Sequence, residues 1–166
     1  MDALLTLPRI RMVLTDCDGC LTDGGMYYTE FGDEMKKFNT RDGMGFSLLR
    51  SKGIVTGIVT SEGVKLNERR AQKMGVDILE SGVRDKLPVV QRLSQERGIP
   101  LDAVAYIGDD INDLEVIRAV GLGCSPADGI PSVRAAARYV TNACGGHGVF
   151  REVADLILSS LEGADE

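Results

Sequence analysis

Residues 13–25 read VLTDCDGCLTDGG, in which a short apolar run ends in two aspartates two positions apart, Asp16 and Asp18. The carboxyl ends of the strands in a parallel α/β sheet face the ligand crevice, so carboxylates directly after a strand lie where a substrate binds. We expect Asp16 to point at the substrate and Asp18 to approach it from another angle, because the chain turns at Gly19. Taken alone, such a string is also an ordinary turn rich in aspartate.

A second acidic cluster follows another apolar run. Residues 104–114 read VAYIGDDINDL, which places Asp109 and Asp110 at the end of a predicted strand and Asp113 one helical turn later. Two acidic clusters at one sheet edge repel each other unless a cation lies between them. Oxygen ligands without histidine or cysteine partners favour Mg²⁺ over Zn²⁺. The sequence therefore predicts a magnesium site.

Two further segments complete the predicted site. A third apolar run ends in Thr60 and Ser61, which puts hydroxyl groups at the same sheet edge. Lys86 comes at the start of a predicted helix, where the helix dipole disfavours a cation, so a lysine there suggests an anion to neutralise. The alternative for Lys86 taken singly is an exposed surface lysine.

The whole chain alternates apolar runs with segments of helical period, which predicts an α/β fold with a doubly wound, mainly parallel sheet. Strands are predicted at Ile10–Leu14, Val55–Val59, Val76–Leu79, Val104–Ile107, Leu122–Cys124 and, more weakly, Arg138–Thr141. Helices are predicted at Gly43–Ser51, Lys65–Met74, Lys86–Arg97, Asp113–Val120, Ser132–Ala137 and Phe150–Leu161.

One segment, about residues 24–39, departs from this alternation. It reads as two short extended pieces around a turn at Phe31, Gly32 and Asp33, which predicts a projecting β-hairpin. The hairpin carries several apolar side chains, among them Tyr27 and Tyr28. A lone two-stranded ribbon with this surface is unstable, so we expect it to pack on another subunit; the alternative is that it folds back on its own core.

Length and composition limit the remaining possibilities. The 166 residues fit one domain, residues 1–166, and 43% are hydrophobic and 27% charged, as in an ordinary water-soluble protein. The net charge of −6 argues against nucleic acid as a partner, and no apolar run is long enough for a membrane span. No secretory signal precedes the first strand, so a cytoplasmic location is expected. The four cysteines are expected to be free and not a disulfide or zinc set: Cys17, Cys20, Cys124 and Cys144.

The ordered set of DxD, strand-ending Thr60, Lys86 and GDDxxD resembles the four motifs of the haloacid dehalogenase (HAD) phosphatase superfamily. The segments DCDGCLTDGG, KKFNTRDGMG, ERRA, SGVRDKL and GGHGVFREV further resemble the branch that contains 3-deoxy-D-manno-octulosonate 8-phosphate phosphatase and the phosphatases of nine-carbon sialic-type sugar acids. The resemblance implies a Rossmann-like, HAD-like fold without a large cap domain, and a homotetramer with the hairpins in the interface. GGHGVFREV is either a further contact to the neighbouring site or a flexible turn.

The resemblance also implies a role for each motif. Asp16 is the nucleophile that forms an aspartyl-phosphate, and Asp18 is the acid and base. Mg²⁺ is held by Asp16, the backbone carbonyl of Asp18, and Asp109. Thr60 and Lys86 bind the phosphoryl oxygens.

The second acidic cluster leaves several roles open. Asp110, Asn112 and Asp113 all lie within reach of the metal site by spacing. Asp113 is expected to orient a metal-bound water or Lys86, and Asn112 to contact metal-bound water or substrate. The alternative for Asn112 and Asp113 is to cap the following helix.

The substrate prediction depends on a departure from the octulosonate phosphatase pattern. The usual Thr-Gly-Arg is Thr60-Ser61-Glu62 here, and Glu62 would repel the carboxylate of a sugar acid. Arg70 and Lys73, otherwise a solvated helix face, are candidates to bind that carboxylate, from the same or a neighbouring subunit. The sequence thus favours a nine-carbon 2-keto-3-deoxy acid 9-phosphate as the small-molecule substrate, with octulosonate 8-phosphate as the alternative.

A non-catalytic assembly module is the alternative of a different class. Loss of the predicted catalytic residues would favour it, but Asp16, Asp18, Lys86 and Asp109 are all present. We therefore expect an enzyme.

Overall fold

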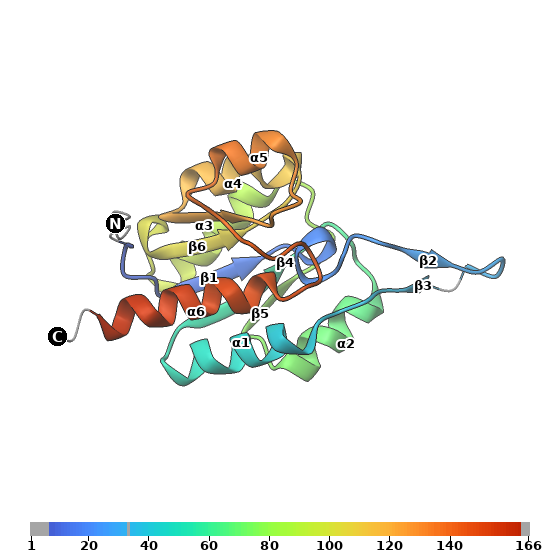
Figure 1. Cartoon of the computed structure of the whole chain (residues 1–166), viewed down its shortest axis with the longest axis horizontal. Helices are drawn as coiled ribbons and strands as arrows, with labels where there is room; N and C mark the ends of the chain where they lie inside the picture. Colours follow the sequence, from blue (N-terminus) through green and yellow to red (C-terminus); the bar gives the residue numbers. More distant parts are fainter. Residues whose placement is uncertain (1–6, 33, 164–166) are drawn as a thin grey trace.

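The computed structural model describes residues 7–32 and 34–163. Its centre is a sheet of six parallel strands in the order β5-β4-β1-β6-β7-β8, as Figure 1 shows in part. The strands are β1 (Met12–Thr15), β4 (Val55–Val59), β5 (Ile78–Glu80), β6 (Val104–Ile107), β7 (Leu122–Ser125) and β8 (Tyr139–Val140). The prediction of a parallel, doubly wound α/β sheet is confirmed.

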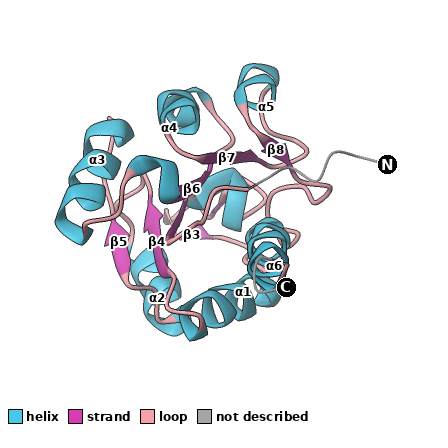
Figure 2. Cartoon of the chain, turned by 90° about the vertical axis from the view of Figure 1, so that its left-hand side faces the viewer, coloured by secondary structure: helices cyan, strands magenta, loops and turns pink. Residues whose placement is uncertain are grey.

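Helices cover both faces of this sheet (Figure 2). They are α1 (Thr40–Ser51), α2 (Lys65–Met74), α3 (Lys86–Arg97), α4 (Leu114–Ala119), α5 (Pro131–Ala136) and α6 (Val149–Glu162). In β1 the side chains alternate, so that Val13 belongs to the apolar cluster beneath α1, α2 and α6, while Met12 and Leu14 belong to the cluster beneath α3, α4 and α5. In the described part of the chain, no helix combines the length and the apolar character that a membrane crossing requires.

The start of α1 differs from its prediction by three residues. Asn39 has extended backbone angles and its side chain accepts a hydrogen bond from Arg41 N, at 2.9 Å, so the helix begins at Thr40 and not at Gly43. Within residues 7–32 and 34–163, the stretch between β1 and α1 contains a short helical turn and the hairpin, and it leaves no room for a large cap domain.

The hairpin is confirmed and projects from the body of the molecule (Figure 1). Its strands β2 (Tyr27–Tyr28) and β3 (Glu34–Met35) pair in antiparallel fashion, and Asp33 of the predicted turn lies outside the described residues. Phe38, at the base, packs on the core beneath α1. Phe31, at the tip, is 85% exposed. The base of the ribbon therefore folds back on its own chain, and the tip does not.

The four cysteines are free thiols, three of them buried. Cys144 is the exposed one.

Helices α1 and α6 pack closely through stacked rings and a cap between helices. The rings of Phe46 and Phe150 lie 3.7 Å apart, centroid to centroid. Gly148 gives α6 no side-chain cap, and Asp42 of α1 supplies one, because its Oδ1 accepts a hydrogen bond from Arg151 N at 3.0 Å. The other carboxylate oxygen of Asp42 is buried without a hydrogen-bond partner. Burial raises the pKa of Asp42 to about 6.

The Asp42 cap predicts a pH-dependent stability. Because the pKa of Asp42 rises on folding from 3.8 to about 6, its contribution to stability is full below 3.8 and is lost as the pH rises through about 6. Asp42→Asn keeps an acceptor for Arg151 N but cannot ionise, so its stability relative to wild type should increase between pH 5 and pH 8, by roughly 1–2 kcal/mol. Urea unfolding at several pH values measures this.

A matched variant separates charge from capping. Asp42→Ala removes the acceptor as well, so it should be less stable than Asp42→Asn by about 1 kcal/mol at every pH. Parallel stability profiles for wild type and Asp42→Asn would show that the ionisation of Asp42 is not linked to folding.

Candidate active site

A pocket of about 270 Å³ opens at the carboxyl ends of β1, β4 and β6. The aligned ends of these strands place Asp16, Thr60 and Gly108 at one sheet edge. Eight predicted site residues line the pocket, with Gly19, Gly24 and Met26: Asp16, Asp18, Thr60, Ser61, Glu62, Asp109, Asp110 and Asn112. The strand-end positions of the acidic and hydroxyl groups thus bring most of the predicted residues together.

Asp16 is almost completely buried at the end of β1. Its backbone N–H donates to Ile107 O at 2.9 Å, which extends the ladder between β1 and β6. Its Oδ1 accepts a hydrogen bond from Cys17 N at 2.7 Å, and its Oδ2 lies 2.9 Å from Lys86 Nζ. Burial and the nearby Asp113 raise the pKa of Asp16 to about 7, against the opposing effect of Lys86.

Lys86 is the first residue of α3, and its ammonium group is buried between two carboxylates. Its Nζ lies 2.9 Å from Asp16 Oδ2 and 2.7 Å from Asp113 Oδ1. Burial opposes the charge of Lys86, but Asp16 and Asp113 outweigh burial and raise its pKa. The cation at the start of this helix is therefore explained by anions, as predicted, and it is not a surface lysine.

Asp113 is fully buried beneath the pocket, and both of its carboxylate oxygens are in use. Oδ1 accepts hydrogen bonds from Lys86 Nζ and from Tyr106 OH, each at 2.7 Å. Oδ2 accepts from the backbone N–H groups of Asp109, at 3.0 Å, and Asp110, at 3.2 Å. Of the roles left open, Asp113 thus orients Lys86 and also takes part in a capping box with Asp110.

Tyr106 was missed as a site residue because it lies inside an apolar strand. Its hydroxyl group is completely buried and bonds Asp113, so the tyrosine supports the carboxylate that holds Lys86. A buried tyrosine hydroxyl normally requires a hydrogen-bond partner. A tyrosine inside a predicted buried strand was therefore the signal that the sequence offered.

Asp16, Asp109 and Asp113 converge, with one carboxylate oxygen of each within 4.8 Å of the others. Burial, together with Asp113 and Asp110, raises the pKa of Asp109 to about 7. Asp113 is occupied by its four donors, which leaves Asp16 and Asp109 as the carboxylates that can accept a cation. An all-oxygen donor set of this kind fits Mg²⁺.

Two glycines allow this close approach. Gly19 has φ +82°, and a Cβ there would collide with the carboxylate of Asp109. A Cβ on Gly108 would collide with Asp113. The glycines of the DG and GDD strings are therefore required by the packing of the carboxylates.

Asp18 lines the pocket and forms an ion pair with Lys36, a residue that the sequence analysis did not identify. Lys36 Nζ lies 2.9 Å from Asp18 Oδ1. Lys36 follows β3 in the hairpin, 18 residues along the chain, so no local pattern indicated the contact.

The polar groups at the pocket mouth support one another. Asn112 Nδ2 donates to Ser61 Oγ at 3.1 Å, and Ser61 Oγ donates to Val83 O at 2.9 Å. Glu62 N donates to Thr60 Oγ1 at 3.3 Å. These contacts connect the loops after β4 and β6 across the pocket.

Arg70 and Lys73 lie outside this pocket and line a separate one between α1 and α2. Arg70 Nη2 donates to Asn39 O at 2.9 Å, and its guanidinium group lies over the ring of Phe38, 5.3 Å from the centroid. The structure therefore does not bring these two residues to the site of their own chain.

Comparisons with known proteins agree with this geometry. A family model for haloacid dehalogenase-like hydrolases matches residues 53–153. The chain is 40% identical over 166 residues to 3-deoxy-D-manno-octulosonate 8-phosphate phosphatase of Yersinia pestis, covering 98% of this chain and 89% of the relative. A crystal structure of the Moraxella catarrhalis octulosonate phosphatase, in complex with magnesium, phosphate and KDO, superimposes with a TM-score of 0.92 at 36% identity, covering 98% of this chain and 93% of that one.

A probable YrbI family phosphatase from Pseudomonas syringae also has a TM-score of 0.92, at 42% identity over 98% of this chain and 94% of that one. The chain belongs to the haloacid dehalogenase-like hydrolases. Within them it is a phosphoric monoester hydrolase of the branch without a large cap domain.

The position of Tyr106 predicts a specific effect on activity. Tyr106→Phe removes one donor from Asp113, so it should lower stability by about 1 kcal/mol and lower kcat several-fold, because Lys86 is held less firmly. Thermal unfolding and hydrolysis of 4-nitrophenyl phosphate measure the two effects.

Tyr139→Phe is the matched control. Tyr139 OH donates to Glu152 Oε1 at 2.8 Å, at the edge of the sheet, so this variant should lose stability but keep its kcat. Equal kcat values for wild type and Tyr106→Phe would contradict a role for Tyr106 in the site.

Proposed function

We propose that this protein is a magnesium-dependent phosphatase that hydrolyses 3-deoxy-D-manno-octulosonate 8-phosphate by way of a phosphorylated Asp16. The observation that carries the proposal is the buried contact of Lys86 with Asp16, a residue that lines the pocket with Asp109. The expectation of a nine-carbon substrate has less support, because relatives from Yersinia pestis and Escherichia coli K12, 40% and 38% identical over nearly the whole chain, are octulosonate phosphatases. The eight-carbon alternative is therefore the one adopted.

In the first step Asp16 attacks phosphorus and the bond from phosphorus to the sugar oxygen breaks. The contacts from Cys17 N and Lys86 Nζ hold the Asp16 carboxylate in place. Asp18, which is partly exposed to the pocket, donates a proton to the departing sugar oxygen.

In the second step water attacks the phosphorus of the aspartyl-phosphate, and Asp18 accepts a proton from that water. Inorganic phosphate is released and the Asp16 carboxylate is regenerated. One carboxylate thus serves as acid and then as base.

Positive charges and a hydroxyl donor stabilise the negative charge of the phosphoryl oxygens. Asp16, Asp109 and the backbone carbonyl of Asp18 would hold Mg²⁺, which supplies positive charge for the phosphoryl oxygens when it is bound. Lys86 supplies a second positive charge. The hydroxyl group of Thr60, whose oxygen accepts from Glu62 N, donates to a phosphoryl oxygen.

Three changes test the mechanism. Asp16→Asn should lower kcat for 4-nitrophenyl phosphate by at least about 10³-fold, because it removes the nucleophile.

Chelation of divalent cations should abolish the wild-type activity, and added Mg²⁺ should restore it. Mg²⁺ should also raise the unfolding temperature of wild type but not of Asp109→Asn, which gives a readout independent of turnover. An Asp16→Asn variant with wild-type kcat would contradict the proposal.

The substrate is tested by comparing kcat/KM for octulosonate 8-phosphate with that for nine-carbon 9-phosphates. We expect octulosonate 8-phosphate to be preferred by tenfold or more, about 1.4 kcal/mol of transition-state discrimination. Glu62→Arg should raise its kcat/KM further by offering a cation to the sugar carboxylate, whereas the same charge change at the exposed Glu68 should not. If wild type instead prefers a nine-carbon acid by tenfold and Glu62→Arg reduces that preference, the nine-carbon alternative would be restored.

The proposal includes a homotetramer whose subunits contact one another through the hairpin. Tyr28 and Met35 are exposed along the ribbon, and Phe31 at its tip, which leaves an apolar surface suited to another subunit. In such an assembly, Arg70 and Lys73 would be available to a neighbouring site, and the GGHG segment would lie between subunits. The double variant Tyr28→Ser, Phe31→Ser should shift the mass in light scattering from tetramer towards monomer. An unchanged mass would contradict an interface through the hairpin.

A further inference from the structure

We propose that Lys36 is a positioning residue for the acid–base carboxylate of Asp18. The hairpin that carries Lys36 would then set the efficiency of proton transfer to the leaving group. This inference rests on the proposed role of Asp18 as acid and base.

The contact between Lys36 and Asp18 is close and shielded. Lys36 Nζ lies 2.9 Å from Asp18 Oδ1 and 3.1 Å from Oδ2, so the ammonium group engages both oxygens. The Lys36 side chain has no exposed surface, whereas 23% of the Asp18 side chain is exposed. A carboxylate at a pocket wall with one shielded partner is restricted in its rotation, which is the requirement for directional proton transfer.

A buried amide fixes the ammonium group from the other side. Asn67 of α2 is almost completely buried, and its Oδ1 lies 3.5 Å from Lys36 Nζ. Asn67 is itself held in place, because its Nδ2 donates to Glu62 O at 3.2 Å and Cys17 Sγ donates to its Oδ1 at 3.4 Å. Lys36 therefore contacts both the amide of Asn67, which two loops of the site hold in place, and the carboxylate of Asp18, which faces the substrate.

Lys36 acts through Asp18 and not on the substrate. Asp18 lines the pocket, whereas the ammonium group of Lys36 is directed at Asp18 and Asn67. The phosphoryl group would be bound by Thr60, which follows β4, and by Lys86, at the start of α3. Loss of Lys36 is thus expected to affect the departure of the leaving group more than the binding of phosphate.

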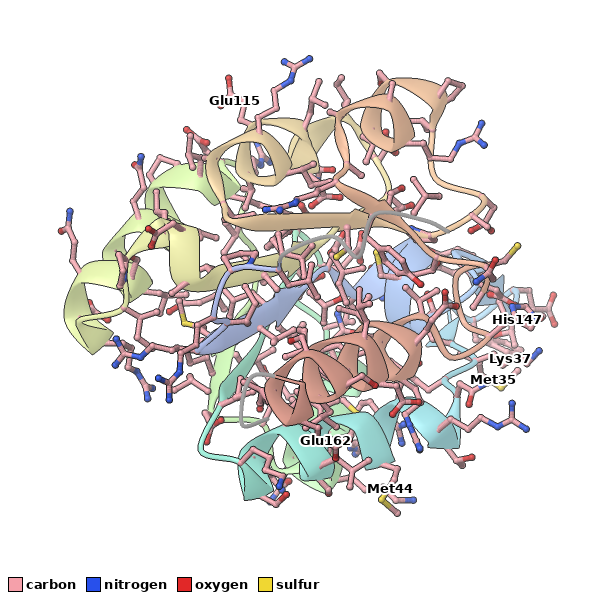
Figure 3. The ribbon with its side chains drawn as sticks, turned by 60° about the vertical axis from the view of Figure 1, so that its left-hand side comes forward. Met35, Lys37, Met44, Glu115, His147 and Glu162 are labelled. Atoms are coloured by element: carbon pink, nitrogen blue, oxygen red, sulfur yellow. The ribbon has the colours of Figure 1, made fainter. Side chains whose placement is uncertain are left out.

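The neighbouring residues show that this placement is specific to Lys36. Met35, just before it, is 61% exposed, and Lys37, just after it, is also exposed. Both residues are labelled in Figure 3. Alternation along the extended chain therefore turns only the middle residue of the three towards Asp18. A lysine that simply kept the hairpin soluble would point outwards, as Lys37 does.

A purely structural role for Lys36 makes a different prediction. If Lys36 only fastened the hairpin to the body, its loss would reduce the rate with all substrates by the same factor. If Lys36 positions Asp18, the loss depends on how much protonation the leaving group requires. A good leaving group departs without an acid, and a poor one does not.

The experiment measures kcat/KM of Lys36→Met with 2,4-dinitrophenyl, 4-nitrophenyl and phenyl phosphate at saturating Mg²⁺. The ratio kcat/KM reports the steps up to departure of the phenol, so later hydrolysis of the aspartyl-phosphate does not obscure the comparison. We expect a change of less than about threefold for the dinitrophenyl ester and a loss of tenfold or more for the phenyl ester, within the range of acid catalysis. Lys36→Arg, which retains a cation, should recover much of the loss with the phenyl ester.

Lys37→Met is the matched control and should follow wild type across the series. Lys36 belongs to neither apolar cluster of the core, so Lys36→Met is expected to fold, and Lys36→Gln provides the same comparison with a polar side chain. An equal loss with all three esters, or no loss, would overturn the positioning role while leaving the phosphatase assignment intact. A wild-type protein that hydrolyses neither the esters nor octulosonate 8-phosphate would instead contradict the proposed function itself.

Discussion

The buried ammonium group of Lys86, held between Asp16 and Asp113, is the interaction on which the site depends. It joins the end of β1, the start of α3 and the turn after β6. Removing one partner from a buried ion pair typically costs about 3–5 kcal/mol, because the other charge is left uncompensated in a poorly solvated place. Such an arrangement persists only if the surrounding elements are fixed, and Tyr106 and the backbone N–H groups that bond Asp113 provide that rigidity.

The sheet order explains why these groups meet. With β1 at the centre, between β4 and β6, three strand ends present Asp16, Thr60 and the GDD turn to one pocket. The chain between β1 and α1 supplies a fourth contribution, because Lys36 returns from the hairpin to Asp18. A small domain without a large cap thus surrounds Asp18, the proposed acid–base carboxylate, with groups from distant parts of the sequence.

Much of the fold and of the site was predictable from local sequence. Asp16 and Asp109 each come two positions after the last residue of an apolar run, and the end of a strand fixes where such residues lie. Helices α2 and α3 were predicted with their observed bounds, and each is followed by a left-handed glycine, Gly75 or Gly98, of the kind that commonly ends a helix.

What escaped prediction depends on contacts between distant residues. Lys36 and Asn67 meet Asp18 and Cys17 across 18 and 50 positions, and Tyr106 was concealed in an apolar strand. Arg70 lies on the helix face that packs on Phe38 and Asn39, a choice of face that its spacing alone did not reveal. Glu62 lines the pocket as predicted. The charge of this one side chain, however, does not by itself distinguish an eight-carbon from a nine-carbon sugar acid.

The central claim is that Asp16 carries the phosphoryl group during turnover. The most direct test is mass spectrometry of peptides from Asp18→Asn, quenched in acid during reaction with 2,4-dinitrophenyl phosphate and Mg²⁺. This leaving group needs no acid, whereas hydrolysis of the intermediate needs the base that the variant lacks, so the phosphorylated enzyme should accumulate. The account predicts one phosphoryl group on Asp16; turnover by the variant with no phosphorylated peptide, or a phosphoryl group on another residue, would contradict it.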